Sequence, residues 1–141
     1  MSEIKLRKPI TQEYDYGCAI ACAAFALNLS YKRAANLVGE SQAASTRFYV
    51  KDLNNFLNSQ GLNYSRKHIK TSTKEEIKKE GTIILLRRSK LYPVGHYLIR
   101  HGDLWMDPWV NMPSSNYDIS KARSGYRKRL PGRPMYVVYC S

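Results

Sequence analysis

The stretch CAIACAAFALNL, residues Cys18–Leu29, is apolar on every side of a helical wheel and rich in alanine. A helix that is apolar all round is normally buried on all sides. Asp15 and Gly17 stand just before the stretch, where capping and turn residues belong. The segment is too short to cross a bilayer, which takes about 20 residues. It therefore predicts a buried central helix around which the rest of the chain packs.

Further helices are expected on both sides of polar connections. Ser30 has the position of an N-cap for a second helix over Tyr31–Val38, and a polar loop follows over Glu40–Thr46. Apolar residues at helical spacing predict a third helix over Val50–Ser59. A small charged helix is expected between Thr73 and Gly81, with its acidic residues in the first turn, where the helix dipole favours them.

The second half of the chain has the pattern of a β-sheet. A tight turn at His101-Gly102 joins two of the expected strands, and residues 111–133 are polar without clear periodicity. The expected strands are Leu62–Ile69, Thr82–Leu86, His96–Arg100, Asp103–Met106 and Pro134–Cys140. Because helices come first and strands afterwards, the sequence predicts an α+β fold with a mainly antiparallel sheet.

Length and composition indicate one domain with a strongly basic surface. The 141 residues suit a single domain over 1–141. The 23 Lys and Arg against 11 Asp and Glu give a net charge of +12. Nucleic acid or another anionic partner is the first explanation of such a charge.

The N-terminus and the cysteines narrow the class of protein. The first nine residues are charged and lack an apolar core, so we expect no signal peptide, no membrane span, and a cytoplasmic location or non-classical export. Three cysteines, Cys18, Cys22 and Cys140, do not make a disulfide framework. No paired spacing of Cys and His suggests zinc, so neither a metal nor another cofactor is expected.

Four polar residues are candidates for chemistry. Cys18 lies at the expected start of the buried helix, where free N–H groups and the helix dipole stabilise a thiolate; the alternative is a small apolar core residue. His96 opens a strand and Asp107 ends the next, so a hairpin brings them to its open end, where Asp107 can orient the imidazole. A surface histidine and an Asp-Pro turn fit equally well. Gln12, six residues before Cys18, can donate to an oxyanion.

The order and spacing of these residues resemble a known family. The segment from Gln12 through Cys18 and the segment Gly95–Pro108 are similar to the two active-site stretches of the C39 and C39-like cysteine peptidases, in the papain-like superfamily. The resemblance spans roughly residues 10–110. It implies a papain-like fold with Cys18 as nucleophile, His96 as general base, Asp107 as the residue that orients it, and Gln12 as oxyanion donor. Ala19 stands where the family usually has glycine.

This resemblance implies a thiol hydrolase that acts on a peptide or protein substrate, with transfer of the acyl group to an amine as a related outcome. Two alternatives stay open. A small basic papain-like domain could be a toxin or phage effector acting on RNA, with His96 as the base toward a 2′-hydroxyl. The chain could also be an inactive, basic binding module.

A basic tail over residues 111–133, just before the terminal strand, holds the densest positive charge. Cations with an interleaved aromatic residue suit phosphate contact and base stacking, and a solvated loop is the simpler explanation. The expected contacts are Lys121, Arg123, Tyr126, Arg127, Lys128, Arg129 and Arg133. The same face would also fit an acidic protein, such as an inhibitor or immunity protein.

Overall fold

The computed structural model describes residues 6–45, 48–69 and 74–141. Five α-helices and six β-strands lie in these residues, together with one 3-10 turn, Ile119–Lys121. The helices are α1 Cys18–Leu27, α2 Tyr31–Val38, α3 Glu40–Ala43, α4 Val50–Ser59 and α5 Lys74–Ile77. The strands are β1 Tyr64–His68, β2 Ile83–Leu86, β3 His96–His101, β4 Leu104–Asp107, β5 Gly125–Arg127 and β6 Pro134–Cys140.

The six strands form one sheet in the order β1-β6-β2-β3-β4-β5. Every neighbouring pair is antiparallel. The last strand, β6, lies between β1 and β2, so the C-terminal strand ties the first strand to the rest of the sheet. The α+β class with an antiparallel sheet, predicted from the order of helices and strands, is confirmed.

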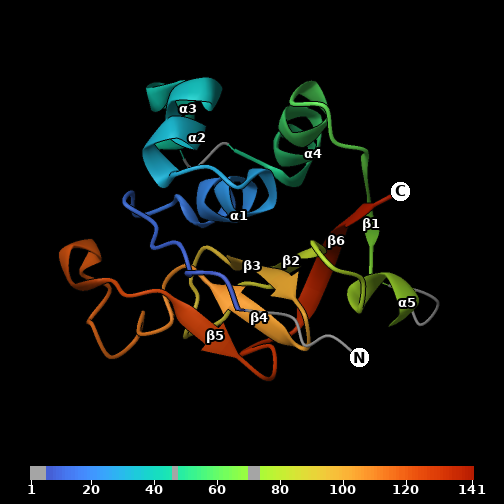
Figure 1. Cartoon of the computed structure of the whole chain (residues 1–141). Coiled ribbons are helices and arrows are strands. Elements are labelled where there is room, and N and C mark those ends of the chain that lie inside the picture. The colour runs from blue at the N-terminus through green and yellow to red at the C-terminus, as the bar shows by residue number, and fades with distance from the viewer. Residues whose placement is uncertain (1–5, 46–47, 70–73) are drawn as a thin grey trace.

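Helix α1 lies between the sheet and helices α2, α3 and α4 (Figure 1). Its residues from Cys18 to Phe25 are all buried, at 9% exposure or less. They form one apolar cluster with the inner faces of α2 and α4 and with Tyr97 and Ile99 of β3. The buried central helix expected from the all-apolar stretch is therefore confirmed.

The opposite face of the sheet is covered mainly by loops, and Ile77 of α5 and Ile119 of the 3-10 turn also pack there. A second apolar cluster packs Leu98 and Trp105 of the sheet against Tyr92, Trp109 and Met112. These last three residues come from the segments that follow β2 and β4. The sheet is therefore buried on both faces, and the loops after β2 and β4 are part of the core.

The sequence expectations for the helices hold with small changes. Ser30 caps α2 by accepting a hydrogen bond from the N–H of Arg33. The polar loop expected over 40–46 is wrong in its first half, because Glu40–Ala43 forms α3. The small charged helix is shorter than expected: α5 ends at Ile77, well before Gly81, and Thr73 lies outside the described residues.

Two expectations for the strands need correction. The tight turn between β3 and β4 lies at Gly102 and Asp103, because His101 is still in β3 and pairs with Leu104. Residues 111–133, expected to lack regular structure, contain β5, whose three residues Gly125–Arg127 pair with β4. Such a short edge strand carries too little periodicity to be seen in sequence. No helix among the described residues is long and apolar enough to cross a membrane.

Candidate active site

Cys18 is the first residue of α1, and local packing fixes this start. Gly17 is the N-cap residue, and no side chain caps the helix. The first-turn N–H groups of such a helix have no intrahelical partner, and they carry the positive end of the helix dipole. A Cβ on Gly17 would lie 1.9 Å from the hydroxyl oxygen of Tyr31, which itself donates to the Gly17 carbonyl. Glycine is therefore needed directly before Cys18.

His96 is the first residue of β3 and has no solvent-exposed surface. Gly95 before it has φ +81, a left-handed conformation that favours glycine, and a Cβ there would lie 3.0 Å from the Leu86 carbonyl. The imidazole stacks on the ring of Tyr92, with centroids 4.9 Å apart and planes 3° from parallel. The turn and the stacked ring hold the imidazole in one orientation.

Asp107 ends β4 beside the start of β3 and is fully buried. Its Oδ1 lies 2.6 Å from Nε2 of His96 and also accepts the N–H of Trp109. Its Oδ2 accepts the Nε–H of Arg127 at 2.6 Å. Burial alone would raise the pKa of Asp107, but the bonds from His96 and Arg127 lower the pKa below its usual range. The carboxylate is thus held ionised and aimed at His96.

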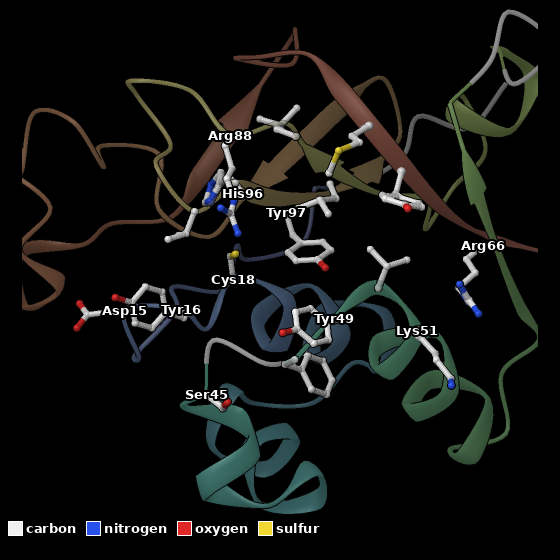
Figure 2. Close-up of a pocket in the computed structure, with 18 of the residues that line it drawn as sticks. Asp15, Tyr16, Cys18, Ser45, Tyr49, Lys51, Arg66, Arg88, His96 and Tyr97 are labelled. Atoms are coloured by element: carbon white, nitrogen blue, oxygen red, sulfur yellow. The ribbon is translucent and has the colours of Figure 1, made fainter.

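Nδ1 of His96 is left for proton exchange with the thiol. It makes no well-formed hydrogen bond with any described residue, and Cys18 points toward the same place in Figure 2. Burial alone would lower the pKa of His96, but Asp107 and the neighbouring Cys18 thiol raise the pKa to about 9. Near neutral pH the imidazole therefore carries a proton and a positive charge beside the Cys18 sulfur.

Gln12 lies near this group but is already engaged. Its amide nitrogen donates to the carbonyls of Tyr14 (3.0 Å) and Asp15 (3.2 Å), and its backbone N–H donates to Pro108. The side chain therefore holds the loop that leads into Cys18 and ties it to the end of β4. An oxyanion would have to draw the amide N–H away from these carbonyls, so the oxyanion role of Gln12 stays a prediction.

A pocket of about 470 Å³ opens beside Cys18 and His96 (Figure 2). Its walls come from the loop before α1, from α4 with the residues preceding it, and from strands β1, β2, β3 and β6. Tyr49 and Val94 line it although they are 62% and 54% exposed. The nucleophile candidate therefore lies at the wall of an open pocket rather than in a sealed core.

The two other histidines are not at this site. His101 accepts the Arg7 N–H at Nε2, bonds Glu80 through Nδ1, and lies edge-on to Phe25. His68 lies against the ring of Tyr136. His96 and His101 lie on opposite faces of the sheet, as side chains an odd number of residues apart in one strand do: the ring of His96 contacts Tyr92 of one core cluster, and the ring of His101 contacts Phe25 of the other.

The seven residues expected to contact nucleic acid divide into two groups. Tyr126 donates its hydroxyl to the Arg7 carbonyl and packs against the core. Arg127 is held by Asp107. Both side chains are used inside the protein, which corrects the expectation that they are free to contact nucleic acid. The exposed members are Lys121, Arg123, Lys128, Arg129 and Arg133.

Sequence reasoning missed two residues of the site. In the sequence Arg127 belongs to a basic run, whereas in the structure its guanidinium donates to Asp107 and to the Val110 carbonyl. Tyr92, which stacks on His96, gave no signal in the sequence. The pairing of β4 with β5 places Arg127 opposite Trp105 and so beside Asp107, a register that local patterns do not reveal.

No group of three or more His, Cys, Asp or Glu among the described residues could hold a metal ion. The chain matches no protein-family model, and no curated protein matches its sequence.

Proposed function

We propose that this chain is a papain-like cysteine hydrolase of the C39-like kind that cleaves peptide bonds. One observation carries the proposal. His96 is bonded to Asp107 through Nε2, and its other nitrogen is left beside a cysteine at the uncapped start of a buried helix. This combination provides a nucleophile, a proton carrier and donors for an oxyanion in one pocket.

The geometry supports a two-step mechanism. The Cys18 thiolate attacks the carbonyl carbon, a C–S bond forms, and the carbonyl electron pair moves to oxygen. The backbone N–H groups at the start of α1 are placed to stabilise that oxyanion. Protonated Nδ1 of His96 gives its proton to the leaving amine as the C–N bond breaks. Water then attacks the thioester, His96 takes up its proton, and the thiolate is released with the acid product.

Asp107 and its neighbours keep this cycle aligned. The carboxylate fixes Nε2 of His96 as the nitrogen that faces it, so Nδ1 remains toward the sulfur. Tyr92 and Arg127 lie behind the pair, on the imidazole and on the carboxylate. Neither lies between His96 and Cys18, so they act by positioning.

The test is selective alkylation of the folded protein with iodoacetamide near neutral pH, followed by peptide mapping. We expect Cys18 to react much faster than Cys140, although Cys140 is the more exposed thiol. Cys18→Ala should abolish both this labelling and the turnover of a mixed library of fluorogenic peptides. Equal labelling of Cys18 and Cys140 would contradict the proposal.

The exposed cations favour a second candidate, a papain-like effector that cleaves RNA with His96 as base. Five exposed Lys and Arg side chains lie on either side of β5 and before β6, and phosphate contact needs such a surface. Incubation of tRNA and rRNA with wild type and with His96→Ala tests it. Intact RNA with both proteins removes this candidate.

A further inference from the structure

The pocket beside Cys18 carries more positive than negative charge. Lys51 of α4, Arg66 of β1 and Arg88 of the segment after β2 line it, against the single carboxylate of Asp15 among the described lining residues. All three cations are exposed. Within the described parts of the chain, none of the three forms an ion pair. Three elements distant in sequence thus bring unpaired cations to one pocket.

The charges are separated along the pocket. Figure 2 shows the Arg88 side chain pointing toward Cys18, with Arg66 and Lys51 on the right of the view. Asp15 lies at the opposite end, beyond Cys18. A bound chain that passes Cys18 would therefore meet cations on one side of the sulfur and a carboxylate on the other.

Aromatic rings lie between the charges: Figure 2 shows Tyr97 and the exposed Tyr49 between Cys18 and the side chains of Arg66 and Lys51. Phe48, Met135 and Tyr136 also line the pocket. A concave site with mainly apolar walls is typical of a binding pocket. Such walls suit peptide side chains and backbone.

We infer that the substrate is a polypeptide segment with acidic residues on the Arg66 and Lys51 side of the bond that is cleaved, an inference that rests on the proposed hydrolase function. Arg88 attracts an acidic group close to Cys18, and Lys51 and Arg66 attract others farther along the pocket. RNA fits less well, because a phosphate at every nucleotide would also meet the Asp15 carboxylate.

Two pairs of thiol reagents test this inference on the intact chain. Iodoacetate is compared with neutral iodoacetamide to probe charge near Cys18. Bromoacetyl-Ala-Glu-Glu-Ala-amide is compared with bromoacetyl-Ala-Gln-Gln-Ala-amide to probe the farther cations. For each pair the ratio of the second-order rates at Cys18 is measured, and the free thiol of cysteine gives the reference ratio.

We expect the ratio of the anionic to the neutral rate at Cys18 to exceed the same ratio for free cysteine by about three- to ten-fold. This excess should fall with added salt. Arg88→Gln should reduce mainly the iodoacetate ratio. The double variant Lys51→Gln with Arg66→Gln should reduce mainly the peptide ratio. Arg87→Gln is the matched control, since it removes the same charge one residue away and does not line the pocket.

The outcomes distinguish a failure of the acidic-substrate inference from a failure of the proposed hydrolase function. Fast iodoacetamide labelling of Cys18 with unchanged ratios in the variants would overturn the acidic substrate and leave the hydrolase intact. Slow, unselective labelling of Cys18 would overturn both. A short single-stranded RNA that protects Cys18 better than Ala-Glu-Glu-Ala-amide would also overturn the inference in favour of a nucleic-acid ligand. Because the neutral reagent reports on Cys18 itself, an unchanged iodoacetamide rate also shows that each variant is folded.

Discussion

Strand β3 carries two histidines, one at each end, and each is hydrogen-bonded to a carboxylate. His96 bonds Asp107 at 2.6 Å, and His101 bonds Glu80 at 2.8 Å. In the second pair the other ring nitrogen accepts the Arg7 N–H, whereas in the first it has no well-formed partner in the described chain. A histidine whose two nitrogens are both occupied fixes structure, and one with a nitrogen left beside a thiol can move a proton.

The carboxylates differ in the same sense. Asp107 is fully buried and receives three donors, from His96, Trp109 and Arg127. The Glu80 side chain is 53% exposed, so water screens its interaction with His101. The buried pair should therefore respond strongly to substitution, and the exposed pair should respond weakly.

Replacing His96 should have the largest effect on the reactivity of Cys18. In His96→Gln the imidazolium is lost, and we expect Cys18 alkylation by iodoacetamide at about pH 6 to fall by about 100-fold, because an unassisted thiol is mostly protonated there. Peptide turnover should fall by about 1,000-fold or more, since proton transfer is lost as well. A variant that retains the wild-type alkylation rate would exclude His96 as the partner of the thiol.

Replacing each carboxylate by its amide compares the two pairs directly. Asp107→Asn should bring the pKa of His96 down from about 9 toward its ordinary value, because burial opposes the charge and the bond to Asp107 sustains it. Cys18 alkylation near neutral pH should then fall by about 10-fold. Glu80→Gln, the matched change, should leave that rate unaltered. Titration of the His96 ring by nitrogen NMR checks the shift, and equal effects of the two amides would contradict the distinction.

The same pKa predicts how stability depends on pH. His96 has a folded pKa of about 9, above its ordinary value of 6.5. A raised histidine pKa stabilises the fold fully below the ordinary value, and this stabilisation is lost as pH rises through about 9. Urea unfolding should therefore show wild type losing its advantage over His96→Gln between these limits. An advantage that stays constant across this range would show that His96 is not charged in the folded protein.

The sequence predicted those parts of the site that local patterns encode. The all-apolar run placed Cys18 at the start of a buried helix, and a hairpin of two short strands brought His96 to Asp107. The pairing of strands distant in sequence could not be predicted. The β4–β5 register turns Arg127 from a surface cation into the partner of Asp107. Tyr92 stacks on His96 because of the conformation of the loop between β2 and β3, and a loop has no sequence periodicity that could predict this contact.

Arg127 therefore gives a finer test of the buried pair. Its guanidinium donates to Oδ2 of Asp107, whereas His96 is bonded to Oδ1, and it also donates to the Val110 carbonyl. In Arg127→Gln the Asp107 carboxylate loses one donor, so its pKa should rise, and His96 should keep its partner but with more freedom. We expect about a 3- to 10-fold loss of turnover at neutral pH, below the loss in Asp107→Asn. A shift of the acid limb of the pH profile toward higher pH would identify positioning through Asp107. A loss of turnover without a shift of the pH profile would show that Arg127 only stabilises the fold.

The smallest effect is expected at the second histidine pair. In Glu80→Gln one side-chain oxygen remains and can still accept from Nδ1 of His101. The other oxygen, which accepts the Gly102 N–H, is replaced by an amide nitrogen. We expect the free energy of unfolding to fall by about 0–1 kcal/mol, because the half-exposed Glu80 side chain can exchange its hydrogen bonds for bonds to water, with alkylation of Cys18 unchanged. Thermal unfolding of the wild type and the variant measures it. If Glu80→Gln slowed Cys18 instead, the two ends of β3 would be coupled, and the division between a structural and a reactive histidine would not hold.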